Sequence, residues 1–254
     1  DVDREAYAIL AEVLHGRSHW AIQPAAVRVT PVERYDVVVI GVGGMGSAAL
    51  YHLARRGKRV LGLERFDLLD EHGSSHGLTR IIRLAYFEHP DYVPLLHRAF
   101  IGWRELEAEA GIELMRSAGL FLCGPPDGEA IEGTLRAAHE HRLPLECLTP
   151  TEARRRFPGF SVPDEHVVVV EAEAGYLHVE RCVHAQIEAA RRYGADLRFG
   201  EQVQRWASVD RGVTVTTDCD TYSAASLVIT AGPWSSQLLT DLGVPSKVLR
   251  KLQL

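Results

Sequence analysis

The sequence predicts an α/β fold that is built around a parallel sheet, and three observations support this. The β-branched run over 37–40 is apolar throughout, as in a parallel strand that is covered on both faces. Glycines in G-x-G-x-x-G spacing follow it at once, and apolar residues at helical spacing come next. A second apolar strand over 59–63 then ends in an acid. This order predicts a Rossmann-like, nucleotide-binding βαβ unit.

The glycines of this unit have separate functions. Gly41 permits the tight turn, Gly43 lets the backbone approach a pyrophosphate, and Gly46 lets the helix pack close to the strand. The positive end of the helix dipole and the unpaired N–H groups of the first turn attract an anion. We therefore expect a dinucleotide pyrophosphate at this turn. The alternative is a glycine turn of an unrelated α/β protein, which the surrounding pattern disfavours.

The acid that ends the second strand is placed to bind a ribose. The helix stops at Gly57, and Glu64 lies eighteen residues beyond Gly46. An acid at about this separation accepts hydrogen bonds from a ribose diol.

Composition and charge limit the kinds of partner. The chain has 254 residues, of which 46% are hydrophobic and 24% charged, and its net charge is −6. Because binding to nucleic acid needs an excess of clustered Lys and Arg, we expect small molecules as partners and no nucleic acid. There is no run of eighteen apolar residues, and the acidic start lacks the basic region of a signal peptide. We therefore expect no membrane span and a cytoplasmic location.

The cysteines and histidines do not suggest a metal site. Four cysteines lie in mostly apolar stretches without C-x-x-C spacing, so we expect buried free thiols. His139 and His141 are two residues apart near a helix end and point to different helix faces.

The remaining pattern predicts two interleaved domains after an appended segment. Residues 1–34 read as an amphipathic helix and a linker. Residues 35–117 and 172–243 are assigned to a discontinuous nucleotide-binding domain, and residues 118–171 and 244–254 to part of a second, α+β domain. The expected helices cover 91–110, 128–141, 151–157 and 179–193, and the expected strands cover 119–123, 166–171, 195–199, 213–217, 221–225 and 227–230.

The segment over 73–83 concentrates polar groups beside the nucleotide-binding unit. We expect a helix to begin near Thr79, which places Arg80 and Arg83 on one helix face. Two buried guanidinium groups need an anion, so an anionic ligand is one interpretation. The other is exposure, or pairing with acids of this chain, for which the candidates are Asp67, Asp70, Glu71 and Glu88.

The same segment also matches the G-x-S-x-G pattern of serine hydrolases over 73–77. In those enzymes the serine lies on a sharp turn directly after a strand, whereas here the preceding strand ends at Glu64. A hydrolase is therefore disfavoured.

The glycine unit, GSSHGLTRIIRLAY over 73–86 and SLVITAGPWSSQLL over 226–239 together resemble the monomeric sarcosine oxidase family, which includes N-methyltryptophan and pipecolate oxidases. The family is similar in fold to D-amino-acid and glycine oxidases. The resemblance implies a Rossmann-like FAD-binding domain with an interleaved, incomplete α+β substrate domain. It also implies FAD as the cofactor.

The resemblance also implies roles for individual residues. His76 and Arg80 border the isoalloxazine ring, and Arg83 binds the substrate carboxylate. Val203 meets the adenine end of FAD. The implied cofactor-binding residues are Gly41, Gly43, Gly44, Met45, Gly46, Glu64, Ser75, Thr79, Arg80, Val203, Ala231 and Gly232.

The implied reaction is oxidation of a secondary amino acid. A hydride equivalent passes from the carbon next to the amine to flavin N5, which leaves an imine, and O2 becomes hydrogen peroxide. In the family, a lysine and a tyrosine help to bind the substrate carboxylate, and both lie beyond the point that matches Leu254. The lysine that activates O2, the cysteine that attaches flavin and the last glycine-rich flavin segment also lie beyond that point. We therefore expect the chain to be the nucleotide-binding two-thirds of a longer protein, without the C-terminal third.

Two other functions remain open at this point. One is a nicotinamide-dependent dehydrogenase, which Glu64 permits, although the late strand over 226–230 suits the longer FAD molecule. The other is a non-catalytic nucleotide-binding fragment.

Overall fold

The computed structural model describes residues 34–68 and 71–240. The helix expected over 1–16, most of the linker and the segment 244–254 lie outside these residues. The described chain contains one six-stranded sheet and two three-stranded sheets.

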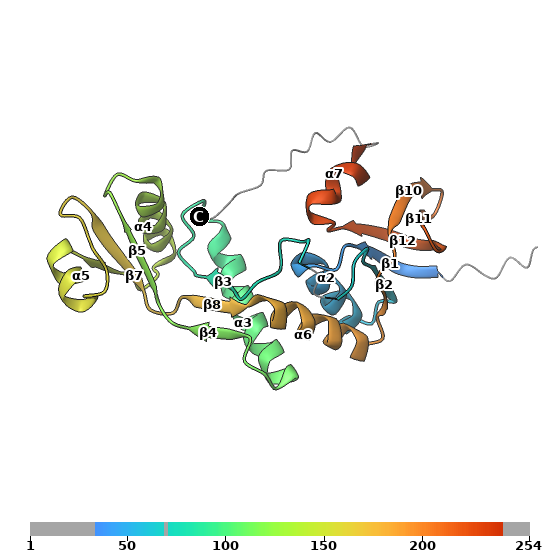
Figure 1. Ribbon diagram of the computed structural model, residues 1–254, viewed down its shortest axis with the longest axis horizontal. Coiled ribbons are helices and arrows are strands. Elements are labelled where there is room, and N and C mark those ends of the chain that lie inside the picture. Colours follow the sequence, from blue (N-terminus) through green and yellow to red (C-terminus); the bar gives the residue numbers. More distant parts are fainter. Residues whose placement is uncertain (1–33, 69–70, 241–254) are drawn as a thin grey trace, which may run out of the picture. The chain divides into compact units, whose positions relative to one another are not determined.

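The six-stranded sheet is centred on β1 (Arg34–Ile40), in agreement with the β-branched run in the sequence (Figure 1). Its valines Val38 and Val39 are fully buried. The strand order is β10-β11-β12-β1-β2-β9, in which β12, β1, β2 and β9 are parallel and β10 and β11 form an antiparallel extension. The bounds of the other strands are β2 (Val60–Leu63), β9 (Asp196–Arg198), β10 (Val203–Val209), β11 (Gly212–Thr217) and β12 (Thr221–Ile229).

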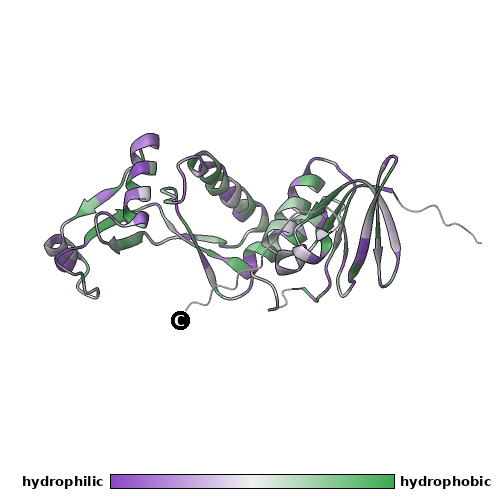
Figure 2. Ribbon diagram, turned by 90° about the horizontal axis from the view of Figure 1, so that it is seen from above, coloured by the Kyte–Doolittle hydropathy of each residue, from purple (hydrophilic) through white to green (hydrophobic). Residues whose placement is uncertain are grey.

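Two helices cover one face of this sheet. They are α2 (Gly44–Arg55) and α6 (Val179–Arg192), and they lie side by side in Figure 1. Their apolar faces share a core in which Leu50 and Ile187 are fully buried. Figure 2 shows hydrophobic residues gathered where the helices meet the sheet, whereas the hairpin at the edge is more polar. The glycine turn is thus fixed on a well-packed βαβ unit.

The two smaller sheets consist of short antiparallel strands. Their orders are β3-β8-β4 and β5-β7-β6. Their strands are β3 (Thr79–Ile82), β4 (Met115–Ser117), β5 (Leu120–Gly124), β6 (Glu146–Leu148), β7 (Val167–Glu171) and β8 (Gly175–His178). The remaining helices are α3 (Tyr92–Ala110), α4 (Glu129–His141), α5 (Pro150–Arg156), α7 (Ser235–Leu238) and the short 3₁₀ helix η1 (Gly232–Trp234).

Most expected elements are confirmed to within a few residues. The strands expected over 221–225 and 227–230 are instead one continuous strand, β12, whose last residues are half-buried rather than buried. The sequence analysis missed β4, β6, β8 and β10. The first three have only 3 or 4 residues, which is too short for a clear periodicity.

The helix expected from Thr79 is wrong. Residues Thr79–Ile82 form strand β3, which pairs with β8 from Thr79 opposite His178 to Ile82 opposite Gly175. Thr and Ile are β-branched and favour a strand, and the partner strand lies about a hundred residues further along the chain. The helical spacing that would place Arg80 and Arg83 on one face therefore does not apply, because Arg80 lies in β3 and Arg83 follows its end.

The expectation of buried thiols is also wrong in part. All four cysteines are free, but only Cys182 is buried; Cys123 is half-buried, and Cys147 and Cys219 are exposed. Within the described residues, no helix has the length and apolar character that a membrane crossing requires. In the same part of the chain, no three His, Cys, Asp or Glu side chains are grouped as a metal site would need.

The cysteines give a direct test of the packing of α6. Burial raises the pKa of the Cys182 thiol to about 12, and the nearby negative charge of Glu107 adds to this effect. We expect iodoacetamide at pH 8 to label exposed Cys147 quickly and Cys182 only in denaturant, because the thiolate is the reactive form. Mass spectrometry of the labelled peptides measures both rates. Equal rates in native protein would contradict the packing of this helix.

Candidate functional site

A cavity lies at the carboxyl ends of β1 and β2, where ligands bind in open α/β sheets. It joins the glycine turn to segments that are distant in sequence. The sequence-predicted residues that line it are Gly41, Gly43, Gly44, Met45, Glu64, Ser75, Val203, Ala231 and Gly232. Gly46, His76, Thr79, Arg80 and Arg83 do not line it.

The glycine turn leaves no space for side chains at two positions. Gly41 has φ +87°, and a Cβ there would lie 2.6 Å from the carbonyl oxygen of Thr230. A Cβ on Gly46 would lie 1.8 Å from the carbonyl oxygen of Gly41. Gly43 differs, because its Cβ position meets only Ser75 Oγ, at 3.8 Å. Gly41 and Gly46 thus serve close packing, and Gly43 leaves backbone open to a ligand.

The N-terminus of α2 faces this cavity without an anionic side chain of its own. Its N-cap is Gly43, which provides no side-chain cap, and the first turn contains no acid. The N–H of Gly44 donates to Ser75 Oγ at 3.0 Å. Such a helix end attracts an anion through its N–H groups and its dipole.

Glu64 is held at the cavity wall by main-chain donors. The N–H of Val42 donates to Oε2 at 2.8 Å, and the N–H of Phe66 donates to Oε1 at 3.2 Å. Each carboxylate oxygen has about two acceptor sites, so the group retains capacity for hydroxyl donors. This arrangement suits the ribose diol expected from the sequence.

The part of the cavity wall around Val203 is held in place by a buried acid, Glu201. Glu201 is buried, and its Oε1 accepts hydrogen bonds from the hydroxyls of Thr217 at 2.6 Å and Tyr222 at 2.8 Å. Burial and the hydrogen bond to Glu201 raise the pKa of Tyr222 to about 12, so its hydroxyl remains a donor. These bonds tie β11 and β12 to the start of β10, where Val203 lies.

The sequence analysis missed an aromatic and cationic part of the wall. The rings of Phe66 and Trp234 are 5.3 Å apart, and the guanidinium of Arg65 lies 4.9 and 5.1 Å from their centroids. All three residues line the cavity. Arg65 and Phe66 follow Glu64 directly, and this was a signal in the sequence, whereas Trp234 is too distant in sequence for its contact with them to be predicted.

Arg80 stabilises its own loop rather than binding an acid. Its guanidinium donates to the carbonyl oxygens of Thr79, Ser74 and His76 at 2.7, 2.6 and 2.9 Å. The N–H of Gly77 in the same loop donates to Glu180 Oε1 at 2.8 Å. The loop that carries Ser75 and His76 is therefore well defined.

Arg83 lies in a different environment. Its side chain is 14% exposed and forms an ion pair of 3.4 Å with Glu88. The rings of Tyr86 and Phe87 each have a centroid 4.9 Å from the guanidinium carbon. Of the acids considered from the sequence, Glu88 is the observed partner, and Asp70 lies outside the described residues. The guanidinium is thus oriented by flat rings and already binds a carboxylate.

The parallel sheet, the glycine turn and the acid at the second strand define a dinucleotide-binding α/β protein. The model of the FAD dependent oxidoreductase family, DAO, matches residues 36–253, and the chain belongs to this family. This confirms the α/β, FAD-binding fold and FAD as the cofactor. The open backbone at Gly43, the helix end without an acid and the fixed Glu64 fit that cofactor.

Individual relatives support the family in more detail. The chain is 47% identical over 218 residues to monomeric sarcosine oxidase from Streptomyces avermitilis, which covers 86% of this chain and 57% of that protein. It is 39% identical over 210 residues to N-methyl-L-tryptophan oxidase from Yersinia pestis, covering 83% and 57% of the two chains. The resemblance to the monomeric sarcosine oxidase family is thereby confirmed. The chain spans little more than half the length of these relatives.

Solved structures of other proteins have the same fold. NikD, described as an unusual amino acid oxidase essential for nikkomycin biosynthesis, superimposes with a TM-score of 0.75 at 34% identity, over 83% of this chain and 55% of that chain. Glycine oxidase from Geobacillus kaustophilus has a TM-score of 0.71 at 24% identity, over 84% and 59% of the two chains, and shares the fold.

A glycine substitution tests the close packing under the site. Gly46→Ala forces a methyl group into the Gly41 carbonyl, so we expect destabilisation of about 3 kcal/mol or more, measured by urea unfolding. Gly102→Ala is the matched control: this glycine lies inside α3, and a Cβ there meets nothing within 4 Å. Alanine should be neutral or stabilise by up to about 1 kcal/mol there. Similar effects of the two changes would contradict the packing described.

Proposed function

We propose that this chain forms the FAD-binding part of an oxidase that acts on secondary amino acids, such as N-methyl amino acids. The observation that carries the proposal is the single cavity that joins the glycine turn, Glu64 and the 230–234 segment. The substrate class is supported by the names of the two relatives, monomeric sarcosine oxidase and N-methyl-L-tryptophan oxidase. The substrate partners are a small secondary amino acid and O2.

Each part of the cavity is proposed to bind a different part of FAD. Main-chain groups from Gly41 to Gly46, Met45 included, bind the pyrophosphate, and Glu64 binds the ribose. Val203 contacts the adenine end. Ser75, Thr79 and Arg80 lie along the flavin, and Ala231 with Gly232 closes over the cofactor. Because Arg80 and Thr79 do not line the cavity, their proposed contacts require the flavin to extend beyond it toward β3.

The chemistry divides between cofactor and protein. When bound, FAD accepts a hydride equivalent from the carbon beside the amine nitrogen and passes the electrons to O2, which gives hydrogen peroxide. The protein orients the substrate: Arg83 binds its carboxylate through a guanidinium that Tyr86 and Phe87 already hold in place. A carboxylate ligand must replace Glu88 as the partner of Arg83 or share the guanidinium with it.

His76 and Arg80 are the groups proposed at the flavin ring. The guanidinium of Arg80 supplies a fixed positive charge, which stabilises negative charge on the reduced ring. Its bonds to Ser74 and His76 hold that charge and the histidine in one geometry.

The domain division of the sequence analysis forms part of this proposal. Residues 35–117 and 172–243 would form the FAD-binding domain, and 118–171 with 244–254 part of the substrate domain. A second candidate function, which the sequence left open, is FAD binding without catalysis. The nicotinamide-dependent alternative lacks support, because the family is FAD dependent.

Cofactor binding is the first test. Titration of the purified chain with FAD should give the two visible absorbance bands of bound oxidised flavin. Glu64→Ala should weaken FAD binding at least about tenfold, since a charged hydrogen-bond acceptor contributes about 1.5–3 kcal/mol. Glu165→Ala, a change of an exposed acid, is the matched control. Absence of flavin binding by the unaltered chain would refute both candidate functions.

Substrate binding is the second test. In the flavin-loaded protein, Arg83→Ala should weaken binding of sarcosine by about 10- to 100-fold, because a bidentate contact to a carboxylate contributes about 1.5–3 kcal/mol. The readout is the sarcosine concentration that gives half of the maximal rate of flavin bleaching under anaerobic conditions. Arg181→Ala removes an exposed arginine on α6 and should have no effect. If Arg83→Ala titrates like the unaltered protein, the carboxylate role of Arg83 is lost.

A further inference from the structure

Glu171 is a buried acid with two main-chain partners. It is the last residue of β7 and is 5% exposed. Its Oε1 accepts the N–H of Leu84 at 2.6 Å, and its Oε2 accepts the N–H of Ala85 at 3.1 Å. Both oxygens therefore act as acceptors, which is the pattern of an ionised carboxylate.

A buried carboxylate is unusual for a residue whose only role is packing. Burying a carboxylate carries a large desolvation cost unless charge or hydrogen bonds compensate it. Among the described residues, no Lys, Arg or His pairs with Glu171, so the compensation comes from the N–H groups of Leu84 and Ala85. Leu84 and Ala85 are buried themselves, at 4% and 1% exposure, so without Glu171 their N–H groups would lack an acceptor.

The peptide that Glu171 holds is the one that carries Arg83. Pairing of β3 with β8 ends at Ile82, so the sheet ladder does not fix the chain beyond that residue. Arg83 comes next, followed by the two N–H groups bound to Glu171. The N–H of Tyr86 then donates to the carbonyl of Leu84 at 2.8 Å.

The same turn also places the rings around the guanidinium. Tyr86 and Phe87 follow Ala85 directly, and each ring lies 4.9 Å from the guanidinium carbon of Arg83. The direction of Arg83 and the position of both rings thus depend on a turn whose interior N–H groups are held by one carboxylate.

We propose that Glu171 is a positioning residue for Arg83: its carboxylate fixes the turn over 83–87 so that the guanidinium is held ready for the carboxylate of an amino acid. This inference rests on the function proposed above for Arg83. Glu171 itself makes no contact with the substrate. Loss of its charge should loosen Arg83 before it affects the rest of the fold.

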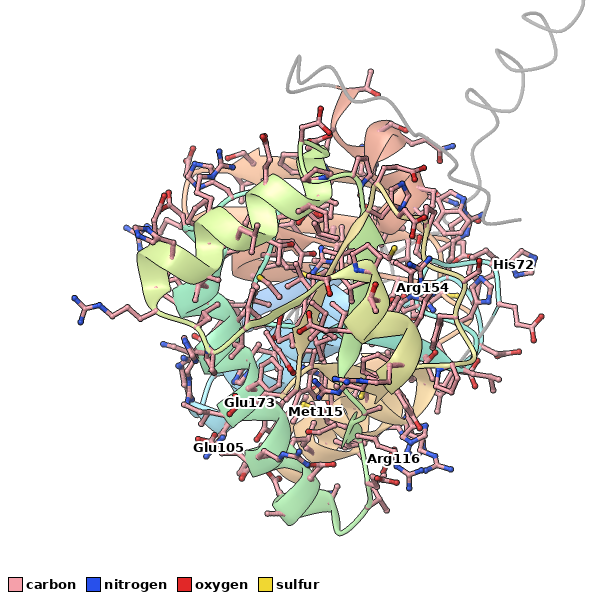
Figure 3. The ribbon with its side chains drawn as sticks, turned by 90° about the vertical axis from the view of Figure 1, so that its left-hand side faces the viewer. His72, Glu105, Met115, Arg116, Arg154 and Glu173 are labelled. Atoms are coloured by element: carbon pink, nitrogen blue, oxygen red, sulfur yellow. The ribbon has the colours of Figure 1, made fainter. Side chains whose placement is uncertain are left out.

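The test uses Glu171→Gln in the full chain. A glutamine retains one acceptor oxygen but turns an NH2 group toward the second N–H, so one bond is lost and two donors face each other. The matched control is Glu173→Gln, which makes the same change two residues away. Glu173 is exposed and lines a shallow hollow with Glu105 and Met115 on the outside of the protein (Figure 3).

The first measurement does not need the cofactor. Phenylglyoxal modifies accessible arginines, and mass spectrometry gives the rate at Arg83. We expect slow modification in the unaltered protein, a rate at least about fivefold higher in Glu171→Gln, and no change in Glu173→Gln. A role in stability alone would lower the melting temperature and leave the Arg83 rate unchanged well below it, which would overturn the proposal.

A conservative variant covers the case in which Glu171→Gln does not fold. Glu171→Asp retains the charge, but its shorter side chain cannot meet both N–H groups at once. We expect a rate between those of the unaltered protein and Glu171→Gln. An Arg83 rate equal to that of the unaltered protein, in whichever of these variants folds, overturns the proposal.

The second measurement links the position of Arg83 to ligand binding. In flavin-loaded protein, acetate should bind about tenfold more weakly to Glu171→Gln than to the unaltered protein, as followed by flavin absorbance. If acetate leaves the flavin spectrum of the unaltered protein unchanged, the proposed role of Arg83 in binding fails. The modification rates still decide whether Glu171 positions Arg83.

Discussion

The close approach of three backbone segments beneath the cavity is the constraint on which the site depends. The hydroxyl of Thr230, just after β12, donates to the carbonyl oxygen of Gly41 at 2.7 Å. Gly46 at the start of α2 meets the same carbonyl, with no room for a side chain. The turn, the helix and a strand about 190 residues away are thereby joined at one point. Any side chain at Gly46 would move the helix N-terminus away from the place proposed for the pyrophosphate.

A second theme is that three charged side chains near the site hold main-chain groups. Glu64 accepts hydrogen bonds from two N–H groups at the cavity wall, and Arg80 donates to three carbonyl oxygens of its loop. Glu171 accepts hydrogen bonds from two N–H groups of the turn over 83–87. Bonds between a charged group and the main chain are stronger than neutral ones and fix backbone direction. Irregular segments around a site gain definition this way without regular secondary structure.

The sequence was sufficient for the local part of this arrangement. The run over 37–40, the glycines and Glu64 lie within thirty residues, and each has a geometric requirement that only certain residue types meet. Contacts between distant segments were not predictable in this way. Residues 79–82 fit a helix pattern by spacing, but pairing with β8 decides their conformation. The contact between Phe66 and Trp234 likewise depends on β12 returning beside β1.

The energetics separate cofactor binding from substrate selection. In the proposed site, a dinucleotide would contact the glycine turn, Glu64 and the wall around Val203 at once, so many small contributions would add up along the cavity. Arg83 offers a carboxylate one contact of about 1.5–3 kcal/mol, which is less than the ~4.1 kcal/mol of a millimolar complex. A guanidinium alone therefore recognises the class of amino acids without choosing among them. Selection among amines has to come from groups that contact the nitrogen and the side chain of the substrate. If Arg83 binds the carboxylate as proposed, a rigid guanidinium would improve that selection, because it would fix the positions of the nitrogen and the side chain.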